Sequence, residues 1–428
     1  MHLLPLLATP AGILAICLAL LIQFLIIKMR WGKWAALIVF SNVAVLSFSL
    51  EELTTGNHRQ FVFPISLLRN FSRPISVALL VMLLPSAIAA ARGHRRRLFL
   101  PAAGAFLAFQ LIVAIRLFVT GTESARAILD SSVSILQFAV LGYGLNLWIQ
   151  SLKDVKTCIR SIAMMNALFV IASLQQLAVS PSLVMENGRF IGVTPNAQFA
   201  SVLLSSTIPA YYYLLLDKSE NIKLRILWGL FAGLAIVFLL GTGSRTGTLM
   251  LVVGTLLFFR LRLAKFLVVV PVVGLFIAVI WRYTHDVTGA SSRLLDTTNT
   301  RERIWSIMWT EFMDAPIFGS GSSVTPENSY LATAANTGVL GLIPLCVFLA
   351  LLLHAAIKVS FARAHLGALR EVPNLVLAGI GSLLIGAVFE AFLLGTLNFA
   401  LVVLFAYMAL LAAALDASEH RPIEQPII

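Results

Sequence analysis

The sequence predicts an all-α fold: a polytopic membrane bundle of about 12 transmembrane helices with one large loop outside the membrane, which contains short amphipathic helices. Two observations lead to this fold class. Apolar residues make up 59% of the 428 residues, and only 12% carry a charge. The mean hydropathy is +0.93. An ordinary soluble domain is roughly 25% charged, because it needs polar surface to cover its core. The composition therefore excludes a soluble enzyme held by one anchor.

Windows of about 20 apolar residues mark the candidate membrane spans. They cover residues 5–27, 34–50, 75–91, 98–119, 129–149, 159–179, 197–216, 225–241, 246–260, 264–281, 336–355, 374–391 and 397–415. Residues 61–72 form a candidate interfacial helix. Because no basic region precedes the first apolar run, residues 5–27 are predicted to be a retained span rather than a signal peptide. Several of these thirteen windows are short, so we expect twelve or thirteen membrane spans.

Short basic loops between these spans predict the topology. Lys and Arg total 31 against 19 acidic residues, a net charge of +12. Residues 92–97 contain four arginines, and alternation from this loop places five other basic loops on the same side: 28–33, 153–160, 218–225, 260–265 and 358–370. Cytoplasmic loops are enriched in Lys and Arg, so this side is predicted to be cytoplasmic. No basic domain is present against which a nucleic acid could lie.

The opposite side is basic through arginine alone, since all eight lysines fall on the cytoplasmic side. Its arginines are Arg59, Arg69, Arg73, Arg126, Arg189, Arg245, Arg282, Arg293, Arg301 and Arg303. Arginine binds phosphate through a planar, bidentate fork and stays charged. The pattern indicates a phosphate-bearing ligand on the outer side. Compositional bias is the alternative, because Arg outnumbers Lys 23 to 8.

One long outer loop divides the chain. It covers residues 282–335 and separates the transmembrane bundle of residues 1–281 from the last spans in residues 336–428. Within the loop, residues 300–314 place five apolar side chains on one helical face: Ile304, Trp305, Met308, Trp309 and Phe312. Thr300 is the expected N-cap, and Pro316 lies just past the end. We expect an amphipathic helix at the membrane interface. A lid that only shields the bundle is the alternative.

A glycine-rich segment, Gly241-Thr-Gly-Ser-Arg-Thr-Gly247, joins two spans on the outer side. Successive backbone amides in such a turn can bind an anion, as can the amides that open the next helix. Arg245 adds a fixed positive charge at this position. The segment lacks the Gly-Lys-Ser/Thr of a phosphate-binding P-loop. Close packing of helices through small residues is the alternative role.

Two further outer segments carry candidate site residues. In residues 189–196, Arg189 is a candidate substrate-binding residue, and a solvated loop charge is its alternative role. Asn196 is a candidate site residue, and its alternative role is to cap the helix that follows. In residues 316–341, Glu327 directly precedes a helix that enters the membrane. Burial there would raise the pKa of a carboxylate and suit a general base, whereas interaction with the helix dipole is the alternative. His285 is an alternative base.

These segments, in this order, resemble the O-antigen ligase and O-antigen polymerase superfamily of bacterial membrane glycosyltransferases. The resemblance covers about residues 185–345. It rests on six short matches: Arg189-x-x-Gly with Pro195-Asn196, Ser244-Arg-Thr-Gly247, Arg301-x-x-Ile-Trp305, Pro316-x-x-Gly-x-Gly321, Asn328-x-Tyr-Leu331, and Gly338 with Gly341. Each match is short, but their order and their outer-side placement make the set specific.

The resemblance implies a protein of the bacterial inner (cytoplasmic) membrane with a large periplasmic loop and an active site that faces the periplasm. The implied donor is a glycan on undecaprenyl diphosphate, transferred to an acceptor glycan or to lipid A-core without a metal or other cofactor. Ligases of the family usually carry His immediately before the Asn of the Asn-x-Tyr-Leu segment, and this chain has Glu327. That departure favours a polysaccharide polymerase, with a ligase as the alternative.

The residues suggest how the chemistry would be divided. We expect Arg245 and Arg301 to clamp the diphosphate, because a departing lipid diphosphate develops negative charge. Glu327 would orient or deprotonate the acceptor hydroxyl. The substrate-binding candidates share an outer-side position: Arg189, Asn196, Ser244, Arg303, Asn328 and Tyr330. No metal site is predicted.

A transporter or flippase is the competing class. Transporters place ionisable groups near the middle of the bilayer. Arg116 and Glu390 are the clearest such residues here, and the sequence shows no relay between them. The cysteines, Cys17, Cys158 and Cys346, form neither a Cys-x-x-Cys pair nor a metal-ligand spacing.

Overall fold

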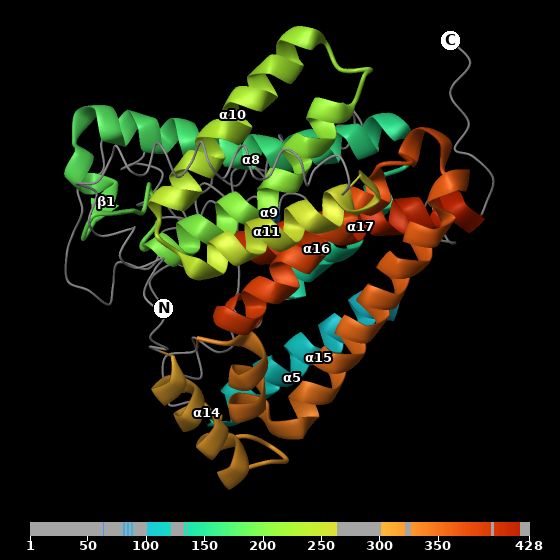
Figure 1. The fold of residues 1–428 in the computed structure, drawn as a ribbon. Helices are drawn as coiled ribbons and strands as arrows, with labels where there is room; N and C mark the ends of the chain where they lie inside the picture. Colours follow the sequence, from blue (N-terminus) through green and yellow to red (C-terminus); the bar gives the residue numbers. More distant parts are fainter. Residues whose placement is uncertain are drawn as a thin grey trace, which may run out of the picture.

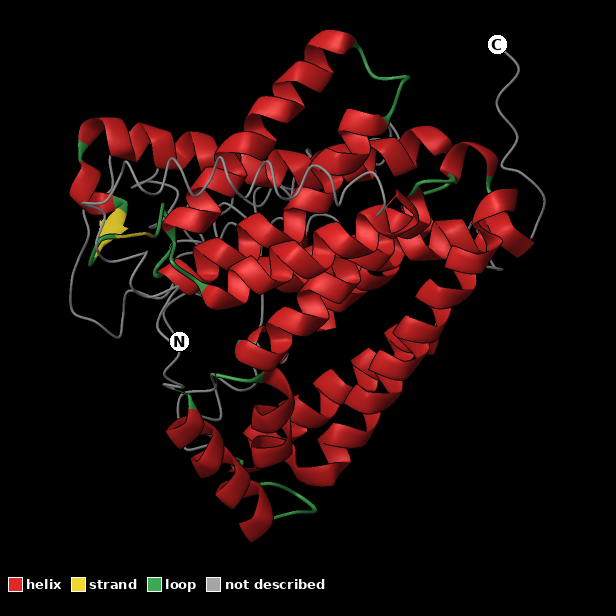
Figure 2. Cartoon of the chain, in the orientation of Figure 1, coloured by secondary structure: helices red, strands yellow, loops and turns green. Residues whose placement is uncertain are grey.

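The computed structural model is mostly helical, with a single short β-hairpin among the residues it describes (Figures 1 and 2). These residues are 63, 80, 81, 84, 87, 88, 101–120, 132–133, 135–262, 301–321, 327–394 and 398–419. Several predictions lie outside this part of the chain: the spans at 5–27, 34–50 and 264–281, most of 75–91, the interfacial helix at 61–72 except for residue 63, and His285.

Eight longer α-helices form the described part. They are α5 (Pro101–Thr120), α8 (Leu152–Val179), α9 (Ala197–Leu216), α10 (Ile222–Gly241), α11 (Arg245–Phe259), α15 (Ser329–Phe361), α16 (Val372–Phe389) and α17 (Phe399–Glu419). The shorter elements are η2 (Phe138–Gly144), α7 (Leu145–Trp148), η3 (Pro181–Leu183), β1 (Met185–Glu186), β2 (Arg189–Phe190), η4 (Arg260–Arg262), α14 (Glu302–Asp314), η5 (Ala362–His365), η6 (Gly367–Leu369) and η7 (Phe392–Leu394).

The predicted spans and the observed helices agree closely in the described part. Six helices are long and apolar enough to cross a membrane, namely α8, α9, α10, α15, α16 and α17, and two shorter ones, α5 and α11, are also apolar. Each of them overlaps a window chosen from hydropathy alone. The protein is therefore a multi-pass membrane protein.

Helices α9 and α11 run parallel at the centre of the bundle (Figure 1). Near their first turns, the Ser201 hydroxyl donates to Ser244 Oγ at 2.9 Å. Near their other ends, the hydroxyls of Tyr212 and Thr255 lie 3.0 Å apart. Gly247 allows the close approach, because a Cβ on it would lie 2.4 Å from Ser201 Cβ. The two helices therefore begin at the same end of the bundle.

One end of the bundle gathers the cationic loops, and we call it the basic end (residues 152–160, 217–225, 260–262 and 358–371). Lys156 pairs with Asp217 at 2.7 Å, so the start of α8 meets the connection between α9 and α10. Arg363 pairs with Glu371 at 2.7 Å across the connection between α15 and α16. All the lysines in the described part lie at this end, as the loop charges predicted.

The opposite end carries the sequence motifs, and we call it the motif end (residues 180–197, 241–247, 301–329 and 389–398). Helix α14 lies there against the first turns of α15. It is the amphipathic helix expected at 300–314, but its predicted cap is wrong: the N-cap is Arg301 rather than Thr300. The Arg301 carbonyl accepts from Trp305 N at 2.9 Å, and its side chain is held by carboxylates described below.

A reciprocal backbone contact fixes the kink in α15. Gly338 has φ of +62° and interrupts the helix, and a Cβ on it would lie 2.3 Å from the Ile317 carbonyl oxygen. Opposite it, Gly319 has φ of +71°, and a Cβ there would lie 2.3 Å from the Asn336 carbonyl carbon. Arg116 Nη2 donates to the Gly319 carbonyl at 2.5 Å. The intramembrane arginine thus holds a loop in place.

Replacing Gly338 by Ala should destabilise the protein by roughly 2–6 kcal/mol, because it adds backbone strain and overpacking at one position. The matched control is Gly367→Ala. Gly367 also has a positive φ, +50°, but no atom lies within 4 Å of the point that a Cβ on it would occupy. Gly367→Ala should lower the free energy of unfolding only by the backbone strain, about 1–2 kcal/mol. Thermal unfolding in detergent compares the two. Equal losses would show that the contact with Ile317 does not matter.

Candidate active site

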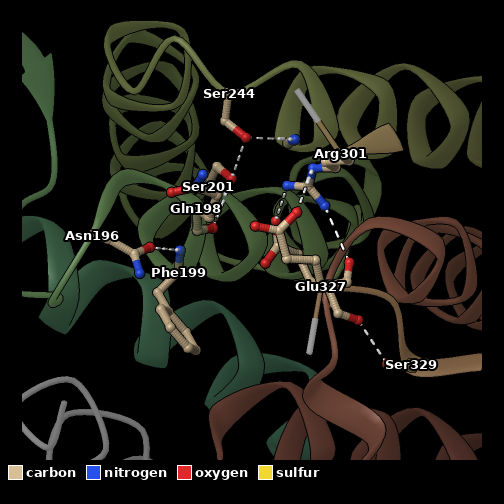
Figure 3. A network of polar contacts seen from close by, with 10 residues as sticks. Asn196, Gln198, Phe199, Ser201, Ser244, Arg301, Glu327 and Ser329 are labelled. Carbon is tan, nitrogen blue, oxygen red and sulfur yellow. Dashed lines mark hydrogen bonds and ion pairs between the residues drawn. The ribbon is translucent and has the colours of Figure 1, made fainter. Parts of the chain in front are cut away.

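Three charged side chains from three distant segments meet at the motif end, and we call them the Arg301 cluster: Arg301, Glu327 and Glu390. Figure 3 shows Arg301 beside Glu327. Arg301 Nη2 lies 2.8 Å from Glu390 Oε1, and Arg301 Nε lies 3.8 Å from Glu327 Oε2. Arg301 Nη1 also donates to the Glu327 carbonyl at 3.2 Å. One guanidinium therefore joins the start of α14, the residue before the N-cap of α15 and the C-cap of α16.

Ser329 locks the end of α16 onto the start of α15. Its hydroxyl donates to the Glu390 carbonyl at 2.6 Å and accepts from Leu393 N at 3.3 Å. Ser329 is fully buried. The Arg301 guanidinium also lies 5.8 Å from the centroid of the Phe389 ring, a cation–π contact. The Ser329 hydrogen bonds and the Phe389 ring contact therefore hold the cluster in place in addition to its ion pairs.

The three side chains of the cluster are partly shielded from solvent, with 18%, 31% and 21% of the side chains of Arg301, Glu327 and Glu390 exposed. Burial raises the pKa of Glu390 above its ordinary value. The Arg301 charge and hydrogen bond work against this rise, and the neighbouring Glu327 charge adds to it. Glu390 therefore holds its proton to a higher pH than a solvated glutamate.

The glycine-rich segment forms a second polar group nearby in the same view (Figure 3). Ser244 is the N-cap of α11, and its Oγ accepts from Gly247 N at 3.2 Å and from the Ser201 hydroxyl. Arg245 is the first residue of α11, and its side chain is exposed. Arg189 Nε donates to the Thr242 carbonyl at 2.7 Å. The structure thus brings the 189–196 and 241–247 segments together.

Both asparagines of the site act as helix caps. Asn196 Oδ1 accepts from Phe199 N at 2.9 Å and opens α9. Asn328 Oδ1 accepts from the Tyr330 and Leu331 amides at 2.9 and 3.0 Å and opens α15. The Tyr330 hydroxyl donates to the Leu384 carbonyl at 2.8 Å, which ties α15 to α16. These side chains hold the helices that frame the site.

Arg303 differs from the other candidate residues. It lies exposed on α14, and within the described part of the chain it makes no ion pair with the Arg301 cluster. A search of that same part finds no group of three or more His, Cys, Asp or Glu side chains that could hold a metal ion.

Three helices begin at the motif end, and each adds partial positive charge at its first turn. Helices α9, α11 and α15 all have their N-termini there, and the Ser201–Ser244 hydrogen bond places the first two side by side. Each helix N-terminus carries a partial positive charge of roughly half an elementary charge. Together with Arg245 they favour an anionic ligand at this end.

Sequence reasoning missed Glu390 as a site residue. It lies 89 positions from its partner Arg301, and only the packing of α16 against α15 brings it there. Its one signal was an acidic residue at the edge of an apolar span, and the sequence showed no relay between it and Arg116. Ser201 and Ser329 gave no signal, because small hydroxyl residues are common on packed membrane helices.

Comparison with known proteins relates part of this chain to a family. Residues 230–346 match the family model described as O-Antigen ligase. The match contains Arg245, Arg301 and Glu327, whereas Arg189 and Glu390 lie outside it. A search of curated proteins found no match. The match points to a membrane enzyme of the glycosyltransferase type. The resemblance of this chain to the O-antigen ligase and polymerase superfamily is thereby confirmed over residues 230–346.

Proposed function

We propose that this protein transfers a glycan from undecaprenyl diphosphate to a growing surface polysaccharide, as an O-antigen or exopolysaccharide polymerase does. The observation that carries the proposal is the ion-pair cluster around Arg301, because Arg301, Glu327 and Arg245 all lie within the segment that matches O-Antigen ligase. A glutamate at position 327, where ligases usually carry His, favours polymerisation. Transfer to lipid A-core is the alternative product of the same chemistry.

The reaction side follows from the two ends of the bundle. The basic end collects the lysines and most ion pairs of the described part, and basic loops face the cytoplasm. The motif end would then face the periplasm of the bacterial inner membrane. A lipid-linked glycan that has reached the outer leaflet presents its diphosphate at that level.

Arg245 is the residue we assign to the diphosphate. As the acceptor oxygen bonds to the anomeric carbon, the bond from that carbon to the diphosphate oxygen breaks and leaves charge on undecaprenyl diphosphate. Arg245 is exposed and lies at the positive end of α11. Arg189 would assist by holding the preceding turn through Thr242.

Glu327 is the proposed base, and it receives the proton of the acceptor hydroxyl. Arg301 and Glu390 position it. Arg301 holds the Glu327 carbonyl at 3.2 Å, and its charge offsets two carboxylates that would otherwise repel the diphosphate. Arg301 thus contributes to anion binding while it fixes the base.

The rate of transfer should fall on the acid side at a pH above the ordinary glutamate pKa of about 4.3. The pKa of Glu390 is raised, so lowering the pH protonates it early and weakens its pair with Arg301. In Glu390→Gln the contribution of Glu390 should be lost, so the rate should begin to fall at a lower pH than in the wild type, with a lower maximal rate. A pH–rate profile of both proteins with lipid-linked donor measures it. An unchanged acid limb in Glu390→Gln would assign that limb to another group.

Reconstitution of the purified protein with lipid-diphosphate oligosaccharide tests the function. A ladder of longer lipid-linked chains without lipid A-core is the expected result. Transfer only when lipid A-core is present would mean a ligase instead. If the donor is not consumed in either mixture, the glycosyltransferase proposal is wrong.

A further inference from the structure

The apolar face of α14 is only half covered by the protein. Met308 is fully buried against Ala332 and Ala335 of α15. Farther around the helix, beyond the edge of this buried face, 55% of Trp309 and 58% of Met313 are exposed. Large apolar side chains grouped in this way on a helix mark a surface that binds something apolar.

This exposed strip continues beyond the helix. Ile317 and Phe318 follow α14 and are each 59% exposed. The Ile317 carbonyl accepts from Leu340 N at 3.3 Å, so the strip reaches α15. There it meets Leu340 and Ile343, which are 45% and 56% exposed on a helix that crosses the membrane. We call Trp309, Met313, Ile317 and Phe318 the apolar edge.

We propose that the apolar edge is inserted among the lipids of the membrane, and that α14 is an interfacial anchor. Its continuity with the exposed apolar face of α15 identifies lipid as the occupant, because α15 is long and apolar enough to cross the membrane. The side of α14 farthest from Met308 suits the water side: Arg303, Thr310 and Asp314 are all exposed. Trp is also the residue that membrane interfaces favour.

The anchor has a consequence for the site, and this consequence rests on the proposed function. Arg301 is the N-cap of α14, so the depth of α14 in the interface sets the depth of the Arg301 cluster. Figure 1 shows α14 lying across the ends of α5 and α15 at the motif end. The anchor would hold the base at the level of the lipid phosphates, where a lipid-linked diphosphate arrives.

Quenching of tryptophan fluorescence by brominated lipid tests the anchor in protein reconstituted in phosphatidylcholine vesicles. The chain has seven tryptophans, so the signal of Trp309 is the difference between the wild type and Trp309→Phe. The control is Trp228→Phe, which removes a buried tryptophan, 6% exposed, on α10. Bromine at shallow acyl positions should quench the Trp309 signal at least twofold more than the Trp228 signal.

Two results would overturn the anchor. Quenching of the Trp309 signal by aqueous iodide but not by brominated lipid would place the edge in water. Protection from both quenchers would mean that a second protein surface covers it. The measurement needs no substrate. If the protein consumes no lipid-linked donor while the Trp309 signal is quenched by lipid, the proposed function fails and the anchor stands.

Discussion

Glu327→Gln should slow glycan transfer by about 10²–10⁴-fold, the usual contribution of a general base. The amide keeps the shape of the side chain but cannot accept the hydroxyl proton. Folding should survive, because the Arg301–Glu327 side-chain contact is loose at 3.8 Å and Arg301 keeps Glu390 at 2.8 Å. Initial rates of donor consumption in vesicles, together with a thermal unfolding curve, measure both effects.

The matched control is Glu302→Gln. Glu302 is exposed in the first turn of α14 and lies next to Arg301 in sequence. Its replacement by Gln therefore makes the same chemical change close to the site. Its rate should stay within twofold of the wild type. Equal losses in the two variants would mean that general negative charge matters and that Glu327 is not the base.

Arg245→Lys and Arg301→Lys should each reduce transfer by about 10²–10³-fold, but for different reasons. Arg245 is exposed, so its Lys variant should stay folded with most of its stability while it loses the bidentate grip on phosphate. Arg301 bridges two carboxylates from different segments, and lysine cannot reach both. Its variant should also lose stability, by up to about 3–5 kcal/mol for a broken buried pair.

Arg370→Lys is the control for these two variants. Arg370 is exposed at the basic end, at the opposite end of the bundle from the motif end. It should keep both its rate and its unfolding temperature. Wild-type consumption of the donor by Arg245→Lys would remove Arg245 from the diphosphate site, because lysine keeps the charge and loses only the fork.

Hydropathy predicted the membrane helices well because a span must be apolar along its whole length. It did not predict where each helix begins. Helix α15 starts at Ser329, ahead of the 336–355 window, because Asn328 caps turns rich in Ala and Thr that pack on α14. The kink at Gly338 then separates those turns from the apolar part. Its cause is a contact with residue 317, which no local pattern reveals.

The candidate site was predictable only where its residues lie in motifs. Arg301 and Glu327 were singled out by sequence, and the structure joins them. Arg116 and Glu390 showed no relay in the sequence, and in the structure each has a partner at the motif end: Arg116 binds the Gly319 carbonyl, and Glu390 binds Arg301. These partners lie 203 and 89 positions apart in the sequence. Such contacts depend on how the helices pack, and no local pattern in a single sequence predicts them.

The most direct measurement is a structure of the protein with a lipid-diphosphate oligosaccharide bound. The account predicts the diphosphate within hydrogen-bonding distance of Arg245 and the first amides of α11, with the sugar beside Glu327. A diphosphate bound at the basic end, among Lys153, Lys156 and Lys218, would contradict it. Such a position would place the substrate on the side where the loop charges put the cytoplasm, and it would support a flippase instead.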